Sequence, residues 1–485
     1  MLRVTLLKLS DTQSVVLFTV HHIIADGWSQ EILIQELATF YKATLLGKIA
    51  TLPDLPVQYA DFSIWQRNWL QGETLQQQLD YWQQQLTENA AEDTFSVLQL
   101  PTDYPRARVQ TYRGAVEQFS LSKQLSERLQ GLAKEQSATL FMTLLAALDV
   151  LLYRYTGQTD LMVGTPIANR HRAEVEGLIG LFVNTLVMRS QLSPQSNFIT
   201  LLNQVKNTTW AAYDHQDLPF EKLVEYLQPE RDLSYSPLFQ VKFRLENAPP
   251  ETVSLPGLSF QRLPQAVTTA KLDLSVDLYE TADGIVGGFE YNSDLFKPET
   301  IQRMVVHFQT LLESIVAAPN SPIAELPMLT AEEQIQQLVT WNSTQNPYRQ
   351  DCCFHHLFEE QARKYPEAIA LLFDSSTRQD PDATEQLTYT ELNHRSNQLA
   401  HQLQSLGIGP ETVVGICVKR SPNMMIAQLA VLKAGGAYLP LDPAYPADRL
   451  TYMLTDAQVP VLLTQSDLFS DLESNNLESN NLEPN

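Results

Sequence analysis

Two adjacent histidines, His21 and His22, stand in the stretch TVHHIIADGWSQEIL (19–33), where an apolar run meets an amphipathic segment. Residues 15–20 have the composition of a strand, and a helix is expected from about Ser29 to Leu45. Successive side chains of a strand point to opposite faces, so a strand that continued through the pair would separate the two rings. The junction therefore predicts one histidine with a structural role and one exposed to a cleft.

The turn after the histidines contains an Asp-Gly pair. Asp26 can hold a tight turn through a hydrogen bond or an ion pair, Gly27 permits unusual backbone angles, and Ser29 is the expected N-cap of the helix. A neutral imidazole with a pKa of about 6.5 can accept a proton from an amine, which suits a general base. The alternative is a hydrogen-bonded core histidine beside an ordinary helix entry. The sequence places no His-x3-His pair or carboxylate cluster here, so no metal ligands are predicted.

Charge and composition narrow the classes of partner. The formal net charge of -23 argues against a nucleic-acid binder or an anionic-membrane binder, because both need a basic face. Cys352, Cys353 and Cys417 fit neither a disulfide framework nor a metal-ligand spacing, so reduced thiols are expected. The most apolar run, 140–152, contains Asp149 and is too short to cross a bilayer. A cytoplasmic protein without nucleic-acid or membrane partners is the expectation.

Helical and strand patterns alternate through the middle of the chain. Thr139 is placed to cap an apolar helix that Gly157 ends, and an Asp283-Gly284 turn joins two strand patterns as a hairpin. A helix is expected from Pro298 to Val316, and a second alternation follows a linker. The pattern predicts an α/β (α+β) chain with more than one domain.

The spacing His-His-x3-Asp-Gly is joined by four further motifs in a fixed order. They are YADFSIWQ (59–66), IGLFVNTLVMR (179–189), HQDLPFEKLV (215–224) and RDLSYSPLFQV (231–241). Together they resemble the motifs of condensation domains of nonribosomal peptide synthetases, relatives of chloramphenicol acetyltransferase. The resemblance covers residues 1 to about 325 and implies a chloramphenicol-acetyltransferase-like fold with two lobes.

The resemblance also implies roles for individual residues. His22 matches the catalytic histidine and His21 its structural neighbour. Asp26 matches an acid that holds the loop by an ion pair without touching substrate, and Gly27 a glycine whose backbone lies close to the reacting thioester. Asn184 can donate to a carbonyl at the cleft or satisfy neighbouring backbone. The candidate residues of a substrate tunnel are Trp28, Ser29 and Asn184.

The C-terminal part carries motifs of a second family. LTYTEL (387–392) and LKAGGAYLPLD (432–442), followed by PAYPADRL, resemble the start of an adenylation domain of the acyl-adenylate-forming superfamily. Both motifs indicate structural roles, with a helix, a glycine C-cap at Gly435-Gly436 and a buried strand. The phosphate loop that would cradle ATP comes later in that family. ATP and magnesium are therefore expected only for a complete adenylation domain.

These motifs divide the chain into four segments. Residues 1–95 are expected to be the remnant of a truncated first condensation lobe, 96–325 the second lobe, 326–352 a linker, and 353–485 a truncated adenylation domain with a disordered tail. The chain is thus expected to be a fragment of a larger synthetase, inactive by itself. It should hold no cofactor, and its partners would be upstream and downstream peptidyl carrier domains that bear phosphopantetheine.

Three functions remain open. The leading one is peptide-bond formation between carrier-bound aminoacyl or peptidyl thioesters, and its rivals are an epimerisation-type domain and a non-catalytic platform that docks carrier domains. The basic cluster NRHR (169–172) is either a solvated loop or a docking contact for an acidic carrier. The sequence does not indicate which amino acids are joined.

Overall fold

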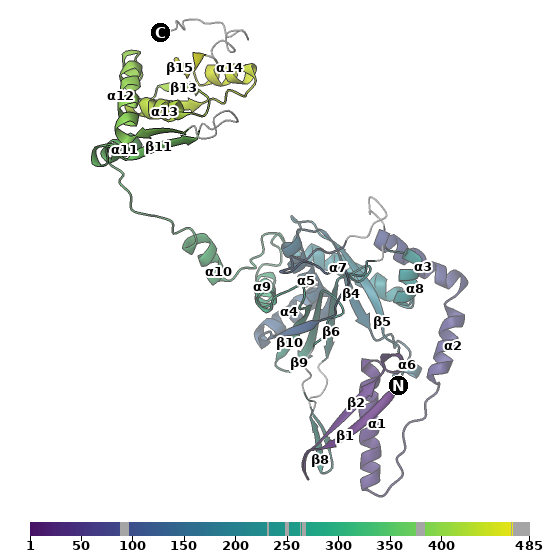
Figure 1. Ribbon diagram of the computed structural model, residues 1–485. Coiled ribbons are helices and arrows are strands. Elements are labelled where there is room, and N and C mark those ends of the chain that lie inside the picture. The colour runs from purple at the N-terminus through teal and green to yellow at the C-terminus, as the bar shows by residue number, and fades with distance from the viewer. Residues whose placement is uncertain are drawn as a thin grey trace. The chain divides into compact units, whose positions relative to one another are not determined.

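The computed structural model describes residues 1–87, 97–229, 232–247, 252–261, 263, 268–374, 384–466 and 468. The chain forms two compact units, Met1–Ser343 and Thr344–Asn485 (Figure 1). The boundary between them falls inside the predicted linker, 326–352. Most of the predicted disordered tail lies outside the described residues.

Unit 1 begins with an antiparallel hairpin in which Leu2 pairs with Val20. The second strand ends at Val20, so it does not continue through the histidine pair as considered above. The helix that follows begins at Gly27, two residues earlier than predicted, because Asp26 rather than Ser29 is its N-cap. The elements of this part are β1 (Leu2–Lys8), β2 (Ser14–Val20), the 3-10 turn η1 (His22–Ile24), α1 (Gly27–Leu45), α2 (Tyr59–Trp69) and α3 (Gly72–Thr87).

A six-stranded mixed sheet forms the centre of unit 1 (Figure 1). Its strand order is β3-β10-β9-β6-β4-β5, and the pairs β4–β6 and β6–β9 are parallel while the other pairs are antiparallel. The predicted hairpin at Asp283-Gly284 is confirmed, since β9 and β10 pair directly across that turn. The strands are β3 (Gly114–Ser120), β4 (Asp160–Ile167), β5 (Asn184–Gln191), β6 (Val241–Asn247), β9 (Leu274–Thr281) and β10 (Gly284–Asn292), and a separate pair is β7 (Thr252–Leu255) with β8 (Leu258–Gln261).

Helices pack on this sheet and enclose the main core. The helix α5 is buried from Met142 to Leu152, begins at the cap Thr139 as predicted, and ends at Gly157 with a φ of 72°. The predicted helix at Pro298 is also confirmed. The helices of this region are α4 (Lys123–Glu135), α5 (Leu140–Thr156), α6 (Ala173–Glu176), α7 (Phe198–Asp214), α8 (Phe220–Leu227) and α9 (Pro298–Ala317).

The first part of the predicted linker packs on unit 1. Leu326 is fully buried in the main core. Two short elements follow, α10 (Ala331–Ile335) and the π-helix η2 (Gln336–Thr340). Glu333 of α10 accepts a hydrogen bond at 3.0 Å from Nε2 of His307 on α9, which fastens the short helix to the unit.

Unit 2 contains a three-stranded parallel sheet in the order β14-β13-β15 and a hairpin of β11 with β12. Thr388 and Glu391 of the LTYTEL motif form the capping box of α12. Gly435 ends α13 with a φ of 91°, as the predicted C-cap requires. The elements are α11 (Phe354–Lys364), β11 (Ile369–Asp374), β12 (Thr384–Thr388), α12 (Tyr389–Ser405), β13 (Val413–Cys417), α13 (Pro422–Ala434), β14 (Ala437–Pro440), α14 (Ala447–Asp456) and β15 (Val461–Thr464).

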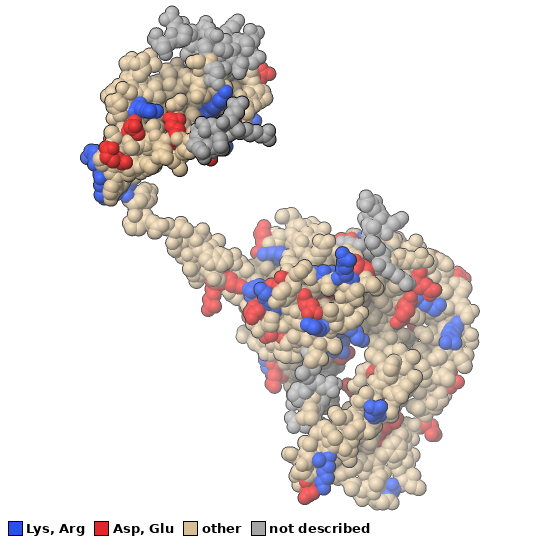
Figure 2. Space-filling model, in the orientation of Figure 1, with Lys and Arg blue, Asp and Glu red and all other residues tan. Residues whose placement is uncertain are grey.

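Two features of the described residues bear on partners. No single helix among them has both the length and the apolar character needed to span a bilayer, and only the bent pair α4–α5 meets both criteria together. On the face shown in Figure 2, lysine and arginine side chains are scattered among acidic ones.

Candidate active site

The two histidines occupy a short turn after β2. His21 is the N-cap of η1, and its Nδ1 accepts a hydrogen bond from the backbone N–H of Ile23 at 3.2 Å. The ring of His22 is exposed and makes no hydrogen bond to any described residue. The difference between the rings thus comes from capping and not from the alternation of a strand. Both residues are exposed, and His22 is the one whose ring no hydrogen bond to a described residue holds in place.

Asp26 is buried directly behind this turn, with 3% of its side chain exposed. Its Oδ1 accepts hydrogen bonds from the backbone N–H and the hydroxyl of Ser29, at 2.9 and 2.7 Å, and its Oδ2 accepts one from the N–H of Phe182 at 3.0 Å. Burial alone would raise the pKa of Asp26, but these hydrogen bonds and the positive charge of Arg170 outweigh it and lower the pKa below its ordinary value. Asp26 therefore carries its charge at neutral pH.

Arg170 supplies the positive charge that this carboxylate needs. Its Nη2 lies 3.1 Å from Oδ1 of Asp26, and its Nη1 donates to the carbonyls of Val175 and Leu178 at 2.8 and 2.7 Å. The guanidinium also lies 4.0 Å from the centre of the Phe182 ring. Neither alternative stated above for the NRHR cluster is right for this residue, because the Arg170 side chain is 1% exposed.

Ser29 lies inside the same network. Its side chain is fully buried, and its hydroxyl contacts both the carbonyl and the N–H of Gly180, at 2.9 and 3.0 Å, as well as Arg170 at 2.9 Å. A hydroxyl enclosed in this way cannot touch a substrate. The expectation that Ser29 lines a substrate tunnel is therefore wrong.

Asn184 also has a structural role. Its amide nitrogen donates to the carbonyls of Gln216 and Leu218, at 2.9 and 2.8 Å, and its oxygen accepts from the N–H of Phe220 at 3.0 Å. The side chain is 8% exposed, so its hydrogen-bonding groups are occupied by backbone. The tunnel role expected for Asn184 is wrong, and the alternative role of satisfying nearby backbone is the one observed.

Gly27 and Trp28 form the exposed first turn of α1. The φ of Gly27 is not positive, and a Cβ added there would meet nothing within 4 Å, so the unusual backbone angles expected for this glycine are absent. The space in front of Gly27 is open. The indole of Trp28 donates to the carbonyl of Glu176 at 3.0 Å, while 46% of the residue remains exposed. Of the tunnel candidates, only Trp28 lies at the surface.

The five motifs of unit 1 differ in how directly they contact the turn that carries His22. The segment 179–189 supplies Gly180 and Phe182, and HQDLPFEKLV receives the side chain of Asn184. Sequence reasoning missed Arg170 as the partner of Asp26. Arg170 could have been predicted from the charge of Asp26, because a buried carboxylate needs a nearby cation and the sequence has one basic cluster, NRHR (169–172).

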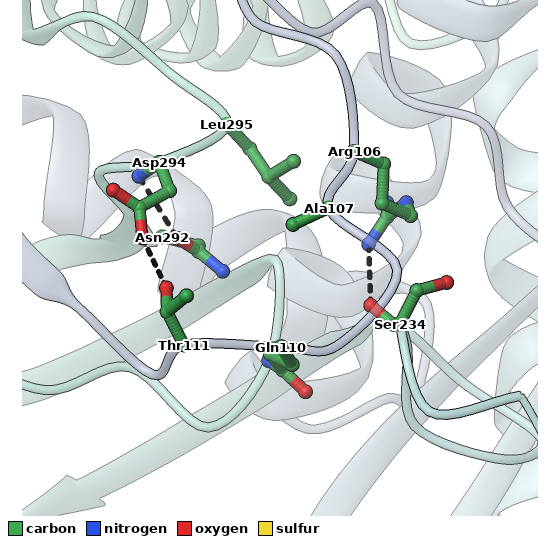
Figure 3. Close-up of a pocket in the computed structure, with 8 residues that line it drawn as sticks. All are labelled: Arg106, Ala107, Gln110, Thr111, Ser234, Asn292, Asp294 and Leu295. Atoms are coloured by element: carbon green, nitrogen blue, oxygen red, sulfur yellow. Dashed lines mark hydrogen bonds between the residues drawn. The ribbon is translucent and has the colours of Figure 1, made fainter.

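A small hollow in unit 1 lies apart from the predicted residues. Figure 3 shows that Arg106 donates to the carbonyl of Ser234, at 3.1 Å, and that Thr111 is hydrogen-bonded to Asp294. Arg106 also pairs with Asp273 through Nη1 at 2.9 Å. These hydrogen bonds join segments that are distant in the sequence, which indicates a structural role for the hollow. The remaining lining residues are Ala107, Gln110, Asn292 and Leu295.

The paired glycines of unit 2 bear on whether it could hold ATP. Gly435 caps α13, and a Cβ added to its neighbour Gly436 would meet Ile408 at 2.9 Å and the carbonyl of Thr412 at 3.0 Å. These glycines therefore serve packing and do not cradle a phosphate. Across the described residues, no three or more His, Cys, Asp or Glu side chains gather as metal ligands would.

Comparison with known proteins assigns a family to each unit. Residues 1–339 match the condensation domain family, and residues 358–484 match the AMP-binding enzyme family. The chain is 48% identical over 474 residues to one of the linear gramicidin synthase subunits of Brevibacillus parabrevis, and 43% identical over 472 residues to a chondramide synthase of Chondromyces crocatus. Each match covers 97% of this chain but only 9% and 12% of the relatives, so the chain spans about a tenth of their length.

Solved structures agree with this assignment. A holo four-domain nonribosomal peptide synthetase bound to AMP and glycine matches 99% of this chain and 36% of its own chain, with a TM-score of 0.83 at 25% identity. The X-domain from teicoplanin biosynthesis matches 68% of this chain and 75% of its own, with a TM-score of 0.62 at 28% identity. This chain belongs to the condensation-domain family of nonribosomal peptide synthetases, and a segment of the AMP-binding enzyme family follows its condensation domain.

Proposed function

We propose that this chain contributes the condensation step of a nonribosomal peptide synthetase. In that step the α-amine of a downstream aminoacyl thioester attacks the carbonyl carbon of an upstream aminoacyl or peptidyl thioester. A C–N bond forms, the C–S bond breaks, and the upstream thiol leaves with a proton. The observation that carries the proposal is an exposed His22 beside the open first turn of α1, in a loop that buried charges fix from behind.

His22 accepts or orients the proton of the attacking amine in this proposal. An imidazole that is free of structural hydrogen bonds is suited to that task near neutral pH. His21 has its Nδ1 engaged by Ile23 and serves as its structural neighbour. Among the described residues, none accepts a hydrogen bond from the backbone amides of Gly27 and Trp28. They lie at the positive end of α1, where they can stabilise the developing oxyanion.

The partners follow from the same reaction. Both thioesters would arrive on phosphopantetheine arms of upstream and downstream peptidyl carrier domains, within the rest of a multidomain synthetase. Tethering two substrates supplies effective concentration, so the base provides only part of the rate acceleration. The three free cysteines suit a reducing cytoplasm. ATP and magnesium would act at a complete adenylation domain.

The test is a loaded-carrier assay in a synthetase that contains this chain. Dipeptidyl thioester that disappears in His22→Ala, with an unchanged melting temperature, supports condensation. Product that persists in His22→Ala indicates the non-catalytic docking platform. Inversion of a carrier-bound residue without bond formation indicates the epimerisation-type domain. His21→Ala is the comparison variant, since it should lower thermal stability together with activity.

A further inference from the structure

The first residue of α2 packs tightly against the loop 180–182. A Cβ added to Gly180 would lie 2.2 Å from Cδ2 and 2.5 Å from Cε2 of Tyr59. The hydroxyl of Tyr59 donates to the carbonyl of Leu181 at 2.9 Å, and its ring meets that of Phe182 edge-on, with centroids 5.2 Å apart. One side chain therefore contacts three successive residues of the loop.

The opposite side of this loop holds the start of α1. The carbonyl of Gly180 accepts a hydrogen bond from the N–H of Asp26 at 3.1 Å and lies 2.9 Å from the hydroxyl oxygen of Ser29. The N–H of Phe182 donates to the Asp26 carboxylate at 3.0 Å. The loop therefore contacts the Tyr59 ring on one side and, on the other, the start of α1, which directly follows the turn that carries His22.

We propose that Tyr59 is a positioning residue for peptide-bond formation, acting through the loop 180–182 on the place of His22 and of the α1 amides. The inference rests on the function proposed above. The ring and the hydroxyl of Tyr59 contact the loop 180–182, so Tyr59 acts through this loop. Because a misplacement of about 1 Å at a catalytic group can cost about a hundredfold in rate, a smaller shift should cost about tenfold.

The first test removes only the hydroxyl. Tyr59→Phe should lower kcat about tenfold and leave KM within about twofold, because substrate contacts are intact. Tyr81→Phe is the matched control, since the Tyr81 hydroxyl is buried without a hydrogen-bond partner in the described structure and its loss should leave kcat unchanged. A normal kcat in Tyr59→Phe, or an equal loss in Tyr81→Phe, would overturn the proposal.

The second test separates positioning from stability. Gly180→Ala should lower both kcat and the melting temperature, because the new Cβ collides with the Tyr59 ring. Adding Tyr59→Leu removes the ring with the closest collision and leaves the approach of the Cβ to Cε2 of Phe182 at 2.9 Å, so it should restore part of the melting temperature without restoring kcat. Recovery of both quantities would mean that Tyr59 matters only for packing.

A third readout does not depend on catalysis. In this chain, hydrogen–deuterium exchange of residues 21–29 should rise in Tyr59→Phe and not in Tyr81→Phe. Exchange that is equal in the two variants would contradict the positioning role. If product forms normally in His22→Ala, the proposed function fails regardless of Tyr59. If His22→Ala is inactive while Tyr59→Phe is fully active, the positioning role alone fails.

Discussion

Asp26 and Arg170 form a buried ion pair although 144 positions separate them in the chain. The two side chains are 3% and 1% exposed, so neither charge can be hydrated and each depends on the other. Within unit 1, the pair connects the start of α1 to the segment between β4 and β5, next to the turn that carries His22. Loss of the pair should lower both the free energy of unfolding and the catalytic activity.

Asp26→Asn should lower the free energy of unfolding by about 3–5 kcal/mol, because Arg170 keeps its charge and loses its charged partner. Activity should fall together with the melting temperature. Urea unfolding of the variant beside Asp54→Asn, which alters an exposed carboxylate, measures the difference. Activity lost at an unchanged melting temperature would instead identify Asp26 as a proton relay.

The same pair should contribute to acid sensitivity. Since the folded-state pKa of Asp26 is lowered, its contribution to stability is present above the ordinary carboxyl range and is lost as pH falls through the folded pKa. Below about pH 4, the free energy of unfolding should therefore fall more steeply with decreasing pH for the native chain than for Asp26→Asn. Parallel curves would contradict a charged Asp26.

Asp149 should have the opposite pH dependence. Burial raises the pKa of Asp149 to about 7, and the hydrogen bond from Ser190 only partly opposes this. The unfolded chain releases this proton near pH 4, so stability should fall as pH rises from about 4 to 7. Between pH 4 and pH 8 the native chain should lose roughly 2–4 kcal/mol more than Asp149→Asn does, as measured by urea unfolding. Equal losses would contradict the raised pKa.

Asn184→Asp should destabilise the chain by about 1–3 kcal/mol, because the carbonyls of Gln216 and Leu218 lose their donors. At temperatures well below the transition, KM should be unchanged, since the side chain does not face a substrate. Differential scanning calorimetry and a loaded-carrier assay measure the two quantities. A raised KM with an unchanged melting temperature would return Asn184 to the tunnel.

Glu333→Ala should release α10 from unit 1. The variant loses both the contact with His307 and the capping hydrogen bond from the N–H of Thr330, at 2.9 Å. Limited proteolysis within 328–343 should accelerate several-fold. Glu332→Ala is the control, because the neighbouring carboxylate is exposed. Equal cleavage rates in both variants would show that the contact does not hold the helix.

Local signals in the sequence predicted much of this fold. Thr139 and Gly157 delimit α5, the Asp283-Gly284 turn defines the β9–β10 hairpin, and Gly435 ends α13. In each case the residue acts on its own few neighbours, through a cap or a turn. Such interactions are encoded within one short segment, so a single sequence is enough to reveal them.

The environment of the site was harder to predict from the sequence. Ser29 is a residue type that often caps helices, yet Asp26 is the N-cap of α1. The Asp26 carboxylate also contacts Phe182 and Arg170, which lie more than 140 residues away in the sequence. Gly27 was expected to adopt unusual backbone angles, but it is the first residue of α1 and its φ is not positive. Contacts with a distant segment surround Asp26 and Ser29, and no local pattern specifies which distant segment a side chain will meet.

The open space in front of Gly27 has a consequence for how this protein can change. The contacts that fix the start of α1 come from the buried side, through Asp26 and Ser29, while the outer side of Gly27 touches nothing within 4 Å. We therefore expect mutations on the outer side to alter chemistry without unfolding the protein. A mutant library screened for folded protein would retain such mutations. Residues on this outer side are therefore suitable positions to vary in a laboratory selection for new substrates.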